Sequence, residues 1–173
     1  MAKKNNVYLV AGSVPELDKD KMYNTSFAFN PKGEEIASYR KIHLFQITYP
    51  DHTTYDESDV LDCGEEVTVF DTPFGRMGIM ICFDARFPYL AEKIRKKGAQ
   101  MIIAPAAFND FTGPMHFDLT FRARAMDNQL FVVAASPSSH SFGEYNVYGH
   151  SLIADPFGRI IEALDRNEDV ILA

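Results

Sequence analysis

Residues 75–88 read Gly75-Arg76-Met77-Gly78-Ile79-Met80-Ile81-Cys82-Phe83-Asp84-Ala85-Arg86-Phe87-Pro88. The first part, 75–82, is apolar on both faces, which is typical of a buried central strand. Apolar residues then recur at helical spacing through 88–97, and Gly98 stands where a C-cap glycine belongs. The stretch therefore predicts a strand that passes through a short elbow into a helix packed on the sheet.

The same alternation continues along the chain. A strand at 101–106, a helix at 117–128 with its apolar residues on one side and a strand at 130–135 follow the elbow. Turn-forming residues separate shorter β segments on both sides of this core. These segments are 7–11, which ends at the turn 12–15, then 23–30, 35–40, 67–71, 151–154 and 159–163, with a last strand from Asp169. The pattern predicts an α/β fold, a mixed sheet covered by helices, in one domain over residues 1–173.

Two polar segments interrupt this pattern. Residues 46–66 show little periodicity and are expected to form a long loop with at most a short helix. Residues 136–148 are expected to form a second polar loop that contains glycine. Loops of this length in a compact domain often carry function.

Composition excludes several classes of protein. Among 173 residues, 17 Lys and Arg oppose 24 Asp and Glu, and the net charge of -7 with a single short basic run at 93–97 argues against nucleic acid as a partner. The longest apolar runs are strand-sized, below the roughly 20 residues of a membrane helix, and residues 1–6 do not resemble a signal peptide. The two cysteines form no disulfide framework, so we expect a cytoplasmic protein with no membrane partner.

Cys82 is the first candidate for chemistry. A side chain at a strand-to-helix elbow is exposed at the carboxyl end of a strand, near a helix N-terminus that favours a thiolate. The alternative is that Cys82 is a small buried apolar residue, as free cysteines often are. Cys63 lies in an acidic loop and is interpreted as a thiol without a chemical role.

Lys41 and Glu57 are the next candidates. Lys41 lies in the alternating run 39–45, where Arg40 and His43 would support it, and its ammonium could donate to a developing oxyanion. Glu57 could orient the lysine or assist proton transfer. The alternatives are a solvated charge at a strand end for Lys41 and an ordinary loop carboxylate for Glu57.

No metal site or nucleotide site is indicated. The five histidines are dispersed and none has a companion ligand at metal-binding spacing. The sequence contains no Gly-rich phosphate loop and no dinucleotide-binding fingerprint. We therefore expect neither a metal nor an organic cofactor.

Several blocks taken together carry a family resemblance. They are Gly12-Ser13-Val14-Pro15-Glu16, Arg40-Lys41-Ile42-His43-Leu44-Phe45, the run 78–88 around Cys82, Arg122-Ala123-Arg124-Ala125-Met126-Asp127-Asn128-Gln129 and the run 149–158. In order and spacing they resemble the carbon-nitrogen hydrolase (nitrilase) superfamily. The segments 107–109 and 112–116 are most similar to its ω-amidase branch.

The resemblance implies an α-β-β-α sandwich, usually dimeric, with a Cys-Lys-Glu triad that hydrolyses a nonpeptide C–N bond. Cys82 matches the nucleophile, Lys41 the cation that stabilises the tetrahedral intermediate and Glu57 an additional carboxylate. The amide of Phe83 would complete an oxyanion hole with Lys41. The implied substrates are small ω-amides of dicarboxylates, such as succinamate or α-ketoglutaramate. Arg86 and the loop residues Phe108, Asn109 and His116 would hold the distant carboxylate.

The sequence also departs from the family pattern. The family's general-base glutamate lies in an N-terminal block that we expect to be missing, and the C-terminal end is expected to be cut inside a strand. Glu16 is interpreted as a turn carboxylate and not as a substitute base. Two other functions stay open, a catalytically silent interaction module and an enzyme acting on nitriles or N-carbamoyl amino acids.

Overall fold

The computed structural model describes residues 1–139, 141–142 and 145–173. Its chain forms two compact units, Met1–Thr68 and Val69–Ala173, and each is described by itself. No helix among the described residues is long and apolar enough to cross a membrane. The single domain expected over residues 1–173 stays a prediction.

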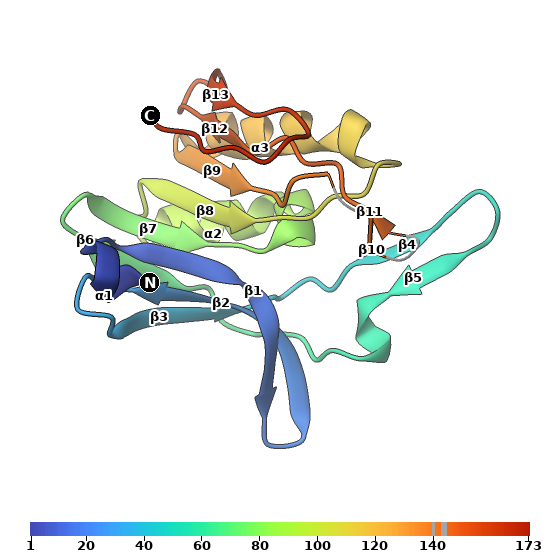
Figure 1. Ribbon diagram of the computed structural model, residues 1–173, viewed down its shortest axis with the longest axis horizontal. Helices are drawn as coiled ribbons and strands as arrows, with labels where there is room; N and C mark the ends of the chain where they lie inside the picture. The colour runs from blue at the N-terminus through green and yellow to red at the C-terminus, as the bar shows by residue number, and fades with distance from the viewer. Residues whose placement is uncertain (140, 143–144) are drawn as a thin grey trace. The chain divides into compact units, whose positions relative to one another are not determined.

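The first unit is built on a three-stranded antiparallel sheet in the order β1-β2-β3 (Figure 1). Its strands are β1 (Leu9–Asp18), β2 (Lys21–Phe29) and β3 (Glu35–Arg40), and the short helix α1 (Ala2–Asn5) precedes them. The turn predicted at 12–15 is wrong, because β1 continues through it. A register shift between Ala11 and Val14 accommodates these residues, and pairing with β2 resumes beyond it.

Residues 46–66 contain more structure than the sequence predicts. The helix η1 (Glu57–Asp59) is the short helix that was expected, but β4 (Gln46–Thr48) and β5 (Thr54–Asp56) also form a hairpin. Each strand has three residues, which is too short for an alternating pattern to be recognised. The hairpin leads the chain directly into η1.

The second unit contains a six-stranded mixed sheet in the order β13-β12-β9-β8-β7-β6. Pairing is parallel between β7, β8 and β9 and antiparallel elsewhere. The strands are β6 (Val69–Thr72), β7 (Gly75–Ile79), β8 (Met101–Pro105), β9 (Phe131–Ala135), β12 (Leu152–Ala154) and β13 (Ile160–Ala163). The predicted mixed sheet is therefore confirmed, although β7 ends three residues before Cys82.

Two helices form the crossovers of this sheet and lie on one face of it (Figure 1). They are α2 (Pro88–Lys96) and α3 (Gly113–Asn128). The approach of α2 is close, because a Cβ added to Gly78 of β7 would lie 2.3 Å from a methyl carbon of Ile94. Gly98 has φ +88° and follows the helix as the predicted C-cap glycine.

The structure corrects two expectations for α3. The helix begins at Gly113, four residues earlier than predicted, because a proline in its first turn needs no hydrogen-bond partner. Leu119 and Met126, which were expected on the apolar side, are 67% and 54% exposed. Arg124 is buried on that side instead, at 9% exposure.

The C-terminal part of the unit forms the predicted hairpin of β12 and β13 around an Asp155 turn. Part of the polar loop 136–148 lies outside the described residues, and β10 (Ser141–Phe142) and β11 (Tyr145–Asn146) pair within the rest. The strand predicted from Asp169 is wrong, since 164–173 contain no strand. The tail carbonyls of Asp165 and Arg166 accept hydrogen bonds from loop amides instead of continuing a sheet.

Candidate active site

Lys41 follows β3 directly and is buried, with 1% of its surface exposed. Its amide donates to the carbonyl of Asn24, and its carbonyl accepts from the amide of Gly64, both at 2.8 Å. The ammonium nitrogen Nζ lies 2.6 Å from Oε2 of Glu57. The alternative of a solvated charge at a strand end is therefore wrong, because a buried ammonium requires a partner of opposite charge.

Glu57 is the first residue of η1 and is held at both its backbone and its side chain. Its amide donates to the carbonyl of Phe45 at 2.9 Å, and the amide of Phe45 donates to its Oε2 at 2.8 Å. One carboxylate oxygen therefore accepts from both Lys41 and Phe45. Charge-assisted hydrogen bonds of this kind fix the position of the lysine nitrogen.

Arg40, next to the lysine, is bound to the carboxylates of β1. Its Nη2 lies 2.6 Å from Oε1 of Glu16 and 2.9 Å from Oδ2 of Asp18, and its guanidinium lies over the ring of Tyr23. Glu16 is therefore a strand residue in an ion pair and not a turn carboxylate. The hydrogen bond from Arg40 lowers the pKa of Glu16, so this carboxyl is held ionised.

Cys82 is the first residue of the short helix η2 (Cys82–Arg86), which follows the buried residues Met80 and Ile81. Its φ is 47°, in the left-handed region that is uncommon for a side chain other than glycine. Strained backbone of this kind gathers at functional sites. The thiol is half-buried, which does not fit the alternative of a fully buried apolar residue.

Two buried charged residues support this elbow. Asp84 is fully buried, and its Oδ2 accepts from the amide of Ile81 at 2.9 Å. Arg124 of α3 donates from Nε to the carbonyl of Ala85 at 2.9 Å. Sequence reasoning assigned no role to either residue, although an arginine on the apolar side of a helix is a recognisable signal.

Phe83 follows the nucleophile candidate and is half-buried. Its ring packs edge-on against Phe87 with centroids 5.5 Å apart. The guanidinium carbon of Arg86 lies 6.0 Å from the same ring, within the range of a cation–π contact. The role of the Phe83 amide in an oxyanion hole stays a prediction.

The side chains of Arg86 and His116 meet, although 30 residues separate them, and their predicted contact with a substrate carboxylate stays a prediction. Nη2 of Arg86 lies 2.7 Å from Nδ1 of His116 in the first turns of α3. Burial, and secondly the charge of Arg86, lower the pKa of His116. The imidazole is therefore neutral near pH 7, and the guanidinium of Arg86 is exposed on the surface of the unit.

Phe108 and Asn109 occupy interior positions. Phe108 is 6% exposed and packs on Phe117 and Phe121, with centroids 5.2 and 5.9 Å away. Oδ1 of Asn109 accepts from the amide of Thr112 at 2.8 Å and from its hydroxyl at 3.0 Å. These contacts shape the loop that leads into α3, and a direct contact of either residue with substrate stays a prediction.

Replacing Arg86 with methionine is expected to raise the pKa of His116. The substitution removes the positive charge, while the burial that also lowers this pKa remains. His116 would then bind its proton at higher pH, though still below the ordinary value. The measurement is an NMR titration of the histidine ring, with Arg76→Met on β7 as a control that leaves the His116 pKa unchanged. An unchanged pKa in the Arg86 variant would show that the two side chains do not meet in solution.

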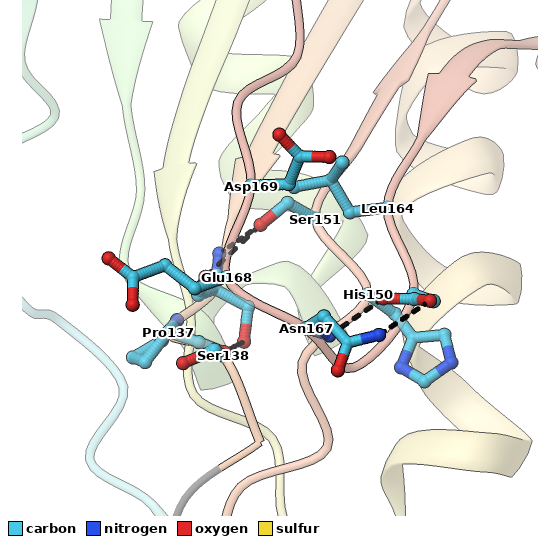
Figure 2. Close-up of a pocket in the computed structure, with 10 residues that line it drawn as sticks. Pro137, Ser138, His150, Ser151, Leu164, Asn167, Glu168 and Asp169 are labelled. Atoms are coloured by element: carbon cyan, nitrogen blue, oxygen red, sulfur yellow. Dashed lines mark hydrogen bonds between the residues drawn. The ribbon is translucent and has the colours of Figure 1, made fainter.

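Other chemical sites are not apparent in the described ranges. They contain no group of three His, Cys, Asp or Glu side chains that could hold a metal ion. Cys63 is exposed in the first unit. A hollow near the C-terminal tail has a volume of about 140 Å³ and is lined mainly by polar residues. Figure 2 shows these residues, which include His150, Asn167 and Glu168.

Comparison with known sequences places these residues in a family. The sequence model described as carbon-nitrogen hydrolase matches residues 1–173. Omega-amidase NIT3 of Saccharomyces cerevisiae is 44% identical over 175 residues, which cover 100% of this chain and 60% of the relative. Omega-amidase NIT2 of Homo sapiens is 42% identical over 171 residues, which cover 99% of this chain and 62% of the relative.

Comparison with solved structures supports the same family assignment. Saccharomyces cerevisiae Nit3, a member of branch 10 of the nitrilase superfamily, matches with a TM-score of 0.87 and 44% identity over 97% of this chain and 59% of that one. The NitFhit protein of C. elegans matches with a TM-score of 0.88 and 36% identity, over 95% of this chain and 41% of that one. The chain thus spans about three-fifths of the length of its omega-amidase relatives. It has the mixed α/β fold that the motifs predicted, and it belongs to the carbon-nitrogen hydrolase family of the nitrilase superfamily.

Proposed function

We propose that this protein hydrolyses the amide C–N bond of small ω-amides of dicarboxylates, with Cys82 as the nucleophile. The observation that carries the proposal is the elbow, where a half-buried thiol sits on left-handed backbone. It occurs in a chain that is 44% identical over its whole length to an omega-amidase. A strained strand-to-helix elbow is a recurrent way of presenting a nucleophile to substrate.

The reaction proceeds in two stages. The thiol of Cys82 loses its proton as the sulfur attacks the amide carbonyl carbon, and the C–N bond breaks as the nitrogen takes up that proton and leaves as ammonia. Water then cleaves the thioester, which releases the dicarboxylate and restores the thiol. The amide of Phe83 and the ammonium of Lys41 donate to the oxyanion of each tetrahedral intermediate.

Lys41 suits this role because its charge is buried and its position is fixed. A donor that is already oriented and desolvated needs no reorganisation when negative charge develops. Glu57, at 2.6 Å from the lysine nitrogen, holds it in place and neutralises it in the resting protein. Glu57 is therefore proposed as a residue that positions the catalytic cation.

Arg86 is proposed to bind the distant carboxylate of the substrate. Its guanidinium is exposed and lies four residues after the nucleophile, on the same short helix. The planar fork of a guanidinium pairs with both oxygens of a carboxylate. A homodimer and a cytoplasmic location, which the family resemblance and the composition suggested, stay predictions.

A substrate panel tests this proposal. We expect ammonia release from succinamate and α-ketoglutaramate at a kcat/KM at least about tenfold above that for nitriles of similar size that lack a carboxylate, since one bound carboxylate contributes roughly 1.5–3 kcal/mol. N-carbamoyl amino acids, which also carry a carboxylate, are compared in the same assay. Ammonia is measured with the purified, folded chain. A higher kcat/KM for the nitrile or carbamoyl compounds would contradict the proposed substrate class and assign the protein to one of these other classes. A folded chain that turns over none of them would favour the silent interaction module.

A further inference from the structure

The side chain of Arg86 is exposed and yet held from two directions. Nη2 contacts Nδ1 of His116 at 2.7 Å, and the guanidinium lies against the ring of Phe83. An exposed arginine without such contacts samples many rotamers, which a ligand must restrict when it binds. The two contacts therefore reduce the freedom of Arg86 before any substrate arrives.

The chemistry of the two groups decides which one donates. A guanidinium has five N–H donors and no acceptor, so Nδ1 of His116 must be the acceptor. The imidazole is then neutral and carries its single proton on Nε2. Four donors of Arg86 remain outside this contact, which is enough for a two-point contact with a carboxylate.

We infer that His116 is a positioning residue, which fixes the guanidinium of Arg86 to select substrates that carry a second carboxylate. This inference rests on the proposed function, because it deepens the account of the same site. His116 does not itself need to touch the substrate. Its effect is on the affinity for the distant carboxylate, and the chemical step at Cys82 is left unchanged.

The position of His116 supports this role. It lies in the first turns of α3, directly before the buried Phe117, so the helix and the aromatic cluster fix its backbone. Arg124 of the same helix donates to the carbonyl of Ala85, the residue before Arg86. The histidine and the arginine are thus attached to one rigid pairing of α3 with η2, and the hydrogen bond between their side chains completes it.

Two variants separate positioning from folding. His116→Asn retains a side-chain oxygen near the position of Nδ1 and can still accept from Arg86, whereas His116→Phe keeps a ring and removes the acceptor. Each is assayed with succinamate and with succinamide, a neutral diamide of nearly the same shape. The phenylalanine variant is expected to raise KM for succinamate about tenfold. We expect its kcat to stay within about twofold, KM for succinamide to be unchanged, and the asparagine variant to recover most of the lost affinity.

The outcomes distinguish this inference from the proposed function. Equal effects of His116→Phe on both amides, or none on succinamate, would overturn the positioning role while amide hydrolysis stands. If neither amide is hydrolysed, the proposed function fails, and the inference is then judged by NMR titration of the folded chain with succinate. Weaker succinate binding in His116→Phe than in the wild type and His116→Asn would support it. Equal binding in all three, or none in the wild type, would overturn it.

Discussion

Replacing Cys82 with alanine is expected to lower ammonia release from succinamate by at least about 10⁴-fold in kcat, because in the proposed reaction no other group forms the thioester. Loss of a nucleophile is the largest single effect expected in covalent catalysis. The rate of ammonia release at saturating substrate concentration measures this loss of kcat directly. Mass spectrometry of the acid-quenched wild type should in addition show the acyl group on the peptide that contains Cys82.

The matched control for this experiment is Cys63→Ala. Cys63 is exposed in the first unit and has no role in the proposed chemistry, so its replacement should leave kcat within about twofold. Circular dichroism and a thermal melt establish that both variants are folded. Residual activity of the Cys82 variant at the wild-type level, or loss of activity in the Cys63 variant alone, would contradict the assignment of the nucleophile.

The second large effect concerns the buried pair of Lys41 and Glu57. Glu57→Gln leaves the ammonium of Lys41, which is 1% exposed, without its ionised partner. Removing one partner of a buried pair costs about 3–5 kcal/mol in the free energy of unfolding. Lys41→Met is expected to cost a similar amount, because Glu57 is then the unpaired charge, and to lower kcat about 10²- to 10³-fold by removing an oxyanion donor. Urea denaturation and ammonia release measure the two effects.

The double variant Lys41→Met with Glu57→Gln separates stability from catalysis. It contains no unpaired charge, so its free energy of unfolding should recover by about 1–3 kcal/mol relative to either single variant. Its kcat should remain as low as that of Lys41→Met. Arg40→Met is the control, because its partly exposed pair with Glu16 contributes only about 1 kcal/mol or less. Additive losses of stability in the double variant would show that the pair is not coupled in solution.

Local patterns in the sequence predicted much of the second unit. The run 75–88 indicated a strand, an elbow and a helix, and all three are present because apolar periodicity and the cap at Gly98 act over short distances. The same reasoning predicted a turn at residues 12–15, where β1 in fact continues. The sequence there is typical of a turn, but a register shift between Ala11 and Val14 accommodates it within the strand. The prediction of a strand in the C-terminal tail was wrong. The tail is apolar in composition, but residues 164–173 do not pair with any strand of the sheet.

The candidate residues were found from the sequence, but only some of their partners. Glu57 was a candidate to orient Lys41, and its carboxylate does pair with the lysine ammonium, sixteen residues away. Arg40 was expected to support Lys41, but it pairs with Glu16 instead. Whether a lysine at a strand end is solvated or buried depends on the loop that returns over it. The hairpin of β4 and β5, which brings Glu57 to Lys41, left almost no periodic signal.

The sequence by itself determined the class of fold and the family, and it supplied the candidates for the reactive groups, because residue types, short-range periodicity and motif spacing are properties of the chain. Only the tertiary structure decided how these groups are held. The buried ion pair of Lys41 and the contact of Arg86 with His116 join residues far apart in the chain. The left-handed backbone of Cys82 lies in an elbow whose Ala85 carbonyl accepts from Arg124 of α3. The physical reason is that strain and buried charge persist only where packing and hydrogen bonds from distant segments compensate for them.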